Sequence, residues 1–139
     1  MRDYPAKEII RNFLSILSGV LVALLLVILI NLILLFMNLE MIGDASVSSA
    51  KEIRYYIFVA ISIAISSGVG GYITAKISTR NDVFHIIITG IVLVLLKLIA
   101  DNFDFSIYDI YERIFLFVIF PFALIGGYWG IKNKNQPSI

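Results

Sequence analysis

Lys97 is the residue of this sequence whose position most directly suggests chemistry, because it lies near the end of a long apolar stretch. An ionisable side chain inside a membrane-spanning segment is costly, and such residues commonly mark ion, proton or ligand sites. Two interpretations fit Lys97. It forms an outward-facing anion or proton site, or its stem reaches the membrane surface ~4.5 Å along the helix. In the second case its ammonium pairs with Asp101 or Asp104.

Asn31 is the second polar candidate, in the outer third of the first apolar stretch. Counting residues from the ends of the two stretches places Asn31 at a depth that the Lys97 ammonium reaches. Asn31, Lys97 and Asp101 therefore form a candidate polar site that opens outward. The competing interpretation is an interhelical hydrogen bond, which is the commoner use of asparagine between membrane helices.

His85 and the serines near Ser66 are the remaining candidates for chemistry. His85 is the only histidine and the chain has no cysteine, so the three or four ligands that zinc or iron needs are missing. No base and orienting acid accompany the serines. We therefore expect no metal site, no cofactor, no catalytic residues and no enzyme activity, and His85 is interpreted as a residue at a helix end.

The composition indicates a membrane protein. Hydrophobic residues make up 60% of the 139 residues, well above the roughly half-apolar composition of soluble domains. Four segments are long enough to cross a bilayer, and together they make a single four-helix transmembrane domain over residues 1–139. The net charge is +1, so nucleic-acid binding is not expected. The predicted spans are about 13–38, 53–77, 83–100 and 110–131.

The distribution of basic residues predicts the orientation of this all-α membrane protein. Lysines and arginines are more frequent at the two termini and the central turn than in the other two connections. The positive-inside rule then places both termini in the cytoplasm of a prokaryotic cell, with the chain as a multi-pass protein of the cytoplasmic (inner) membrane. The residues on the terminal side are Arg2, Lys7, Arg11, Lys76, Arg80, Lys132 and Lys134, against Lys51, Arg54 and Arg113 on the other.

Small residues spaced four apart mark two predicted packing faces, at the ends of the second and fourth spans. On a helix this spacing makes a nearly side-chain-free stripe that a neighbouring backbone can approach closely. The repeated Gly-Gly-Tyr, with one glycine in each of the other two spans, suggests two hairpins arranged as a parallel repeat. The predicted helix-packing residues are Gly19, Ser66, Ser67, Gly70, Gly71, Ala75, Gly90, Gly126, Gly127 and Gly130.

The segment 70–90 resembles small four-span bacterial membrane proteins of unknown function. In that pattern the second helix ends in Gly-Gly-x-x-x-Ala, here Gly70, Gly71 and Ala75, and a histidine and a glycine follow early in the third helix, here His85 and Gly90. The resemblance covers about a fifth of the chain. It implies the four-span layout and no activity.

Two functions from different classes fit these features. The first is a small accessory or structural subunit, whose glycine faces exceed what a four-helix bundle needs and leave one stripe for a larger integral membrane protein complex or for self-association. The alternative is a small homo-oligomeric transporter or pore with an outward polar site near Lys97. The bilayer is a partner in both.

Overall fold

The computed structural model describes residues 6–38, 49–79, 82–100 and 110–135. They form four helices, α1 (Ala6–Asn38), α2 (Ser49–Ile77), α3 (Asp82–Ala100) and α4 (Ile110–Lys134), and this part of the chain contains no strand. The predicted all-α fold with four helices is confirmed. Helix α4 continues through Pro121, as membrane helices can when their neighbours satisfy the freed carbonyl.

Each helix is long and apolar enough to span a membrane. The candidate spans are Ala6–Phe36, Tyr56–Ile77, Val83–Ala100 and Arg113–Lys134. Even α3, with 19 residues, extends ~28 Å at 1.5 Å per residue, close to the ~30 Å hydrocarbon core of a bilayer. The protein is therefore a multi-pass membrane protein, and its many exposed leucine, isoleucine and phenylalanine side chains face lipid.

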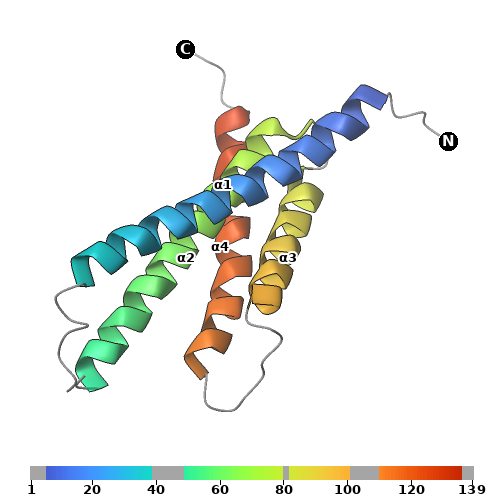
Figure 1. Ribbon diagram of the computed structural model, residues 1–139. Coiled ribbons are helices and arrows are strands. Elements are labelled where there is room, and N and C mark those ends of the chain that lie inside the picture. The colour runs from blue at the N-terminus through green and yellow to red at the C-terminus, as the bar shows by residue number, and fades with distance from the viewer. Residues whose placement is uncertain (1–5, 39–48, 80–81, 101–109, 136–139) are drawn as a thin grey trace.

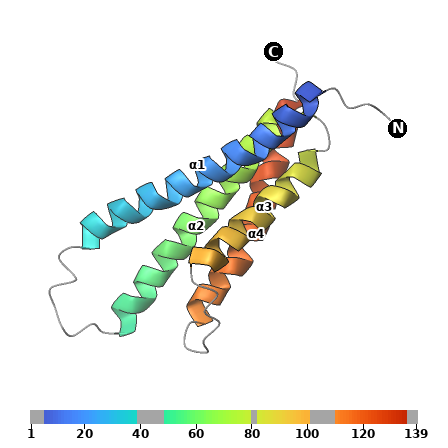
Figure 2. The ribbon, with the colours of Figure 1, turned by 45° about the vertical axis from the view of Figure 1, so that its right-hand side comes forward.

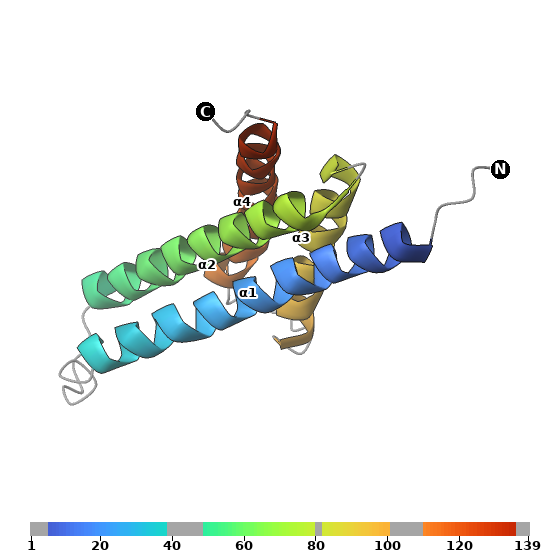
Figure 3. The same ribbon diagram turned by 90° about the horizontal axis from the view of Figure 1, so that it is seen from above.

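Helix α2 lies at the centre of the arrangement and contacts each of the other three helices. Helix α1 lies along one side of α2 and α4 packs on another, so that α1 and α4 make no contact in the described residues (Figures 1 and 3). We call the end near residues 6, 78 and 135 the terminal end, and the end near residues 38, 49, 100 and 110 the loop end. The helices diverge toward the loop end (Figure 2).

The interior of the bundle is built from small polar residues as much as from apolar ones. Buried hydroxyl side chains lie on one face of α2 at Ser62, Ser66 and Thr74, spaced by four and eight residues, and Ser78 follows four residues later, just beyond the end of the helix. Ser66 Oγ donates to the Ser62 carbonyl at 2.7 Å, and Thr74 Oγ1 to the Gly70 carbonyl at 3.0 Å. These bonds within the helix satisfy the hydroxyls, which leaves a narrow face for close helix packing.

Glycines bring α2 and α4 into backbone contact. A Cβ atom added at Gly126 would collide with the carbonyl oxygen of Gly68, and one added at Gly71 would collide with that of Ala123. At Gly130 an added Cβ would lie 2.8 Å from the Tyr72 carbonyl oxygen. The glycine stripe of α2 and the glycine stripe of α4 therefore pack against each other inside the molecule.

The other glycines of the described helices also face neighbouring helices of the same chain. Gly19 of α1 meets Gly70 of α2, where a Cβ on Gly70 would lie 2.8 Å from the Gly19 carbonyl oxygen. On the α3 side, Gly90 lies against Phe120 and Gly127 against Ile86. No glycine stripe in the described helices is left for a partner, contrary to the expectation of a spare one.

Polar groups at the terminal end hold the last turn of α2. Arg11 Nε donates to the carbonyl of Ile77 at 2.9 Å, and Lys134 Nζ donates to the carbonyl of Ser78. Cations at a helix C-terminus satisfy its last carbonyls and interact favourably with the helix dipole. Asn12 Oδ1 accepts from the backbone N–H of Thr79 at 3.2 Å and from its Oγ1 at 2.9 Å.

Asn12 should therefore contribute to the stability of the bundle. Asn12→Leu removes both bonds and leaves the Thr79 N–H unsatisfied, which should cost about 1–3 kcal/mol. The measurement is the melting temperature in detergent micelles. Asn133→Leu is the matched control, because Asn133 is exposed on the last turn of α4. Equal melting temperatures for the two variants would contradict the assigned role of Asn12.

Candidate functional site

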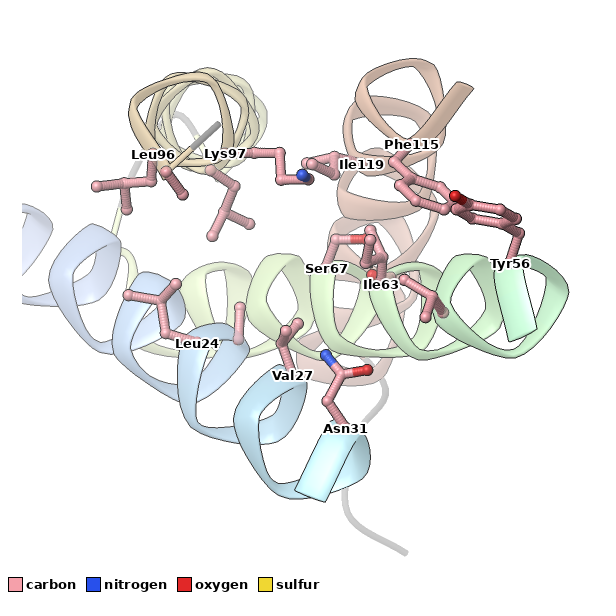
Figure 4. A pocket seen from close by; sticks show the side chains of 14 residues that line it. Leu24, Val27, Asn31, Tyr56, Ile63, Ser67, Leu96, Lys97, Phe115 and Ile119 are labelled. Atoms are coloured by element: carbon pink, nitrogen blue, oxygen red, sulfur yellow. The ribbon is translucent and has the colours of Figure 1, made fainter. Parts of the chain in front are cut away.

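A pocket of about 380 Å³ lies between the loop-end halves of all four helices (Figure 4). Small-molecule sites in proteins have volumes of roughly 300–1,000 Å³ and mostly apolar walls with a few polar groups. This pocket has both properties. Its lining residues are Ala23, Leu24, Val27, Asn31, Tyr56, Val59, Ile63, Ser67, Leu93, Leu96, Lys97, Ala100, Phe115 and Ile119.

Asn31 and Lys97 line this same pocket from different helices. Figure 4 shows the Lys97 side chain extending from α3 toward Ile119 of α4, and the Asn31 amide pointing from α1 toward α2. Asp101, the third residue of the predicted polar site, lies outside the described residues. The structure thus brings two of the three predicted residues to one pocket.

Tyr56 and Ser67 also line the pocket, although the sequence pattern suggests other roles for them. Tyr56 looks like part of an interfacial aromatic belt, and Ser67 like a packing residue. The two residues lie about three helical turns apart and therefore share one face of α2. This spacing is the sequence signal that could have placed both on the same site. The Tyr56 ring packs on Phe115, with ring centroids 6.3 Å apart.

The polar residues Asn31, Lys97 and Tyr56 line the loop-end part of the pocket, and the part near Ala23 and Ser67, on the terminal side, is called its floor. Along α1, Asn31 lies about two turns, or ~12 Å, closer to the loop end than Ala23. Lys97 and Tyr56 likewise lie toward the loop ends of α3 and α2. Apolar side chains of all four helices make the walls between these groups and the floor.

The pocket ends where the glycine contacts begin. Ala23 lines the floor and is also in contact with Gly70, where an added Cβ would approach the Ala23 Cβ to 2.9 Å. Ser67, also on the floor, immediately precedes Gly68, whose carbonyl abuts Gly126. Backbone contacts between helices therefore close the pocket on the terminal side.

The chain matches no protein-family model, no curated protein and no solved structure. The function must therefore be argued from the pocket itself.

The described lining residues offer hydrogen-bonding groups and one ammonium group. Ser67 is the only serine among the described lining residues, and its Oγ already donates to the Ile63 carbonyl at 2.8 Å. Among the described lining residues there is no histidine and no carboxylate to activate it. Within the described ranges no three metal-binding side chains cluster.

His85 is buried at the terminal end of α3, on the far side of the glycine contacts from the pocket. Its carbonyl accepts a hydrogen bond from Thr89 Oγ1 at 3.0 Å, and Thr89 Oγ1 in turn lies 3.0 Å from Thr74 Oγ1 of α2. His85 thus belongs to the packed half of the bundle, where the structure does not bring it near Asn31 or Lys97.

Proposed function

We propose that the protein binds a small ligand within the membrane, in the pocket that carries Asn31 and Lys97. The observation that supports this proposal is the pocket itself. It is formed by all four helices, and Lys97, which lines it, lies within the span Val83–Ala100. Binding without catalysis is part of the proposal, since the described lining residues offer hydrogen-bond donors and a cation but no activated nucleophile.

A site closed on one side fits a carrier or a binding protein better than a pore. A pore within one chain needs a continuous path between the two membrane surfaces. Gly19 lies against Gly70, and Gly68 against Gly126, with no side chain between the backbones. The contacts leave no room for a path through the terminal half of this bundle, so we favour a transporter-type site over a pore.

We further propose that the pocket opens toward the outside of a prokaryotic inner membrane, with both termini in the cytoplasm. The support is the positive-inside rule. The basic residues described at the terminal end are Lys7, Arg11, Lys76, Lys132 and Lys134.

Cysteine labelling tests both the pocket and its orientation, because the natural chain contains no cysteine. Asn31→Cys should react with a membrane-impermeant, negatively charged methanethiosulfonate reagent added to intact cells. Leu32→Cys is the matched control, since Leu32 is 48% exposed on the apolar surface and does not line the pocket. We expect it to react at least tenfold more slowly, because thiolates do not form in lipid.

A second substitution ties the reactivity to the pocket. Val27→Trp places a large ring in the lining and should protect Asn31→Cys, whereas Ile28→Trp, on the exposed side of α1, should not. If Asn31→Cys is labelled neither from the outside nor from the inside of the membrane, the proposal is contradicted. Equal labelling in the presence of Val27→Trp would also contradict it.

The accessory-subunit role remains a second candidate, and α1 is the feature that supports it. Only 17% of the most apolar stretch of α1 is buried, against 39% in α2. This surface would suit either lipid or a larger integral membrane protein. The glycine stripes no longer support the role, because they are covered internally. Stoichiometric co-purification of a larger membrane protein through a C-terminal tag would favour it, and a homo-oligomer would favour the transporter.

A further inference from the structure

We infer that the ligand is the acyl chain of a bilayer phospholipid, which enters the pocket sideways from the surrounding leaflet, between α1 and α3. This inference rests on the proposed function and names the ligand class for the same pocket. The chain would lie among the apolar walls and end near the floor at Ala23 and Ser67.

The exposure of the lining residues shows where the pocket opens. Of the fourteen described lining residues, only Leu24 of α1 and Ala100 of α3 are exposed. Phe115 and Ile119 of α4 also line the pocket, yet each is only 5% exposed, so contact with the pocket alone adds little exposure. Leu24, at 37%, is therefore reached from outside the bundle. The opening lies between α1 and α3, on the side where Figure 4 shows Leu24 and Leu96.

The opening faces the hydrocarbon core of the membrane. Leu24 lies 12 residues before Phe36, the last residue of the candidate span of α1, which corresponds to ~18 Å of helix. Half of a ~30 Å hydrocarbon core is ~15 Å, so Leu24 lies near the middle of the bilayer. Ala100 is the last residue of the α3 span. The opening therefore extends from the loop end of α3 to the bilayer centre, which is the depth of one leaflet.

The surface around the opening is itself lipid-facing. Leu25 and Ile28 of α1 follow Leu24 and are 65% and 61% exposed. Ile99 of α3 precedes Ala100 and is 57% exposed. All of these side chains are apolar and lie within candidate spans. A lipid on this surface can pass a chain into the pocket without leaving an apolar environment, so its entry requires no polar group to lose water.

The inner part of the pocket favours a hydrocarbon chain over water. A buried water needs roughly two to four polar partners, and apolar cavities stay dry. At the floor, Ala23 has no polar side-chain atom, and the Ser67 Oγ already donates to the Ile63 carbonyl at 2.8 Å. An acyl chain supplies the van der Waals contacts that an empty space would forfeit. The lining residues without a polar side-chain atom are Ala23, Leu24, Val27, Val59, Ile63, Leu93, Leu96, Ala100, Phe115 and Ile119.

The experiment uses the full-length protein in nanodiscs of phosphatidylcholine that carries a photoactivatable diazirine near the end of one acyl chain. Tandem mass spectrometry locates the labelled side chains. Ile119 and Phe117 are compared, because both lie on the tryptic peptide 114–132. Ile119 lines the pocket and is 5% exposed, whereas Phe117 is 80% exposed. If acyl chains stay outside, labelling follows exposure and Ile119 receives roughly tenfold less label than Phe117, or less still. We expect the two residues to be labelled equally within about threefold.

Leu24→Trp tests the opening, because it places a large ring at the entrance. Labelling of Ile119 should fall at least about fivefold, as steric overpacking of an apolar site allows, while that of Phe117 stays unchanged. Leu25→Trp is the matched control, since Leu25 is the same residue type at the next position, is 65% exposed and does not line the pocket. Both positions are exposed, so the bundle should fold in both variants. Equal labelling of Ile119 in the two variants would overturn entry between α1 and α3.

The reactivity of Asn31→Cys distinguishes failure of this inference from failure of the proposed function. If Ile119 receives only the label that its exposure predicts, while Asn31→Cys still reacts with the charged reagent and Val27→Trp still protects it, the pocket stands and the acyl chain is excluded. If Ile119 is not labelled and Asn31→Cys does not react, both proposals fall. Loss of Ile119 labelling in Val27→Trp but not in Ile28→Trp supports both proposals.

Discussion

Gly126→Ala should destabilise the protein by more than about 2 kcal/mol, although it adds a single methyl group. The added Cβ would occupy the position of the Gly68 carbonyl oxygen, which belongs to the backbone of α2. A side chain could rotate away, but a helix backbone cannot move without separating α2 from α4 along their whole contact. Free energies of unfolding in mixed micelles of mild detergent and sodium dodecyl sulfate measure the effect.

Gly68→Ala is the matched control. Gly68 lies at the same contact between α2 and α4, and its own carbonyl oxygen is the atom that a Cβ at Gly126 would meet. A Cβ at Gly68 would lie 3.6 Å from the Phe122 carbonyl oxygen, an ordinary van der Waals distance. Alanine also has a helix propensity up to ~1 kcal/mol better than glycine. We therefore expect Gly68→Ala to be neutral or stabilising. A comparable loss of stability in the two variants would contradict the geometry of the contact.

The four helices could be predicted from the sequence because apolar length is sufficient to specify a membrane span. The depth of Lys97 and Asn31 follows in the same way, since each residue advances a helix by 1.5 Å. That Lys97 and Asn31 line the same pocket could not be predicted from their depth alone. It depends on which helices are neighbours, and a count along the chain does not give that.

The expectation of a spare glycine stripe fails for a physical reason that Gly70 and Gly71 illustrate. Consecutive residues on a helix point about 100° apart. Gly70 therefore faces Gly19 of α1 while Gly71 faces Ala123 of α4. A central helix uses adjacent glycines for two different neighbours. The small residues of α2 that the sequence suggests as a surplus are therefore used inside the molecule, on two faces that pack against α1 and α4.

Tyr56 shows why part of the pocket was not predicted. A tyrosine near the end of a membrane span is usually an interfacial residue. In this fold the helices diverge toward the loop end, so a residue at that depth on the inner face of α2 lines a space between helices (Figure 2). The divergence follows from the location of the glycine contacts, which lie toward the terminal end.

Gly19→Val should open the contact between α1 and α2 and leave the contact between α2 and α4 intact. A side chain at Gly19 would collide with Thr74 Oγ1 and approach the Gly70 carbonyl oxygen to 2.6 Å. Helix α1 packs on α2 and α3 and makes no contact with α4 in the described residues. The expected product is therefore a bundle of α2, α3 and α4 with α1 displaced.

Thiol reactivity in the otherwise cysteine-free chain locates the opening. Ala23→Cys reports on the α1–α2 contact and Ala123→Cys on the α2–α4 contact, because both alanines are almost fully buried. In detergent micelles, Gly19→Val should raise the labelling rate of Ala23→Cys at least tenfold and leave that of Ala123→Cys unchanged. Tenfold corresponds to a loss of about 1.4 kcal/mol in the local opening equilibrium.

Gly126→Ala should give the reverse pattern, with faster labelling of Ala123→Cys than of Ala23→Cys. Leu21→Val controls for a change on the lipid-facing side of α1, where Leu21 is 50% exposed. If Gly19→Val exposes both cysteines equally, the two contacts form one cooperative unit. In that case the pocket floor, which ends at Ala23, could not open without unfolding the whole bundle, and a carrier would have to release its ligand on the side from which it came.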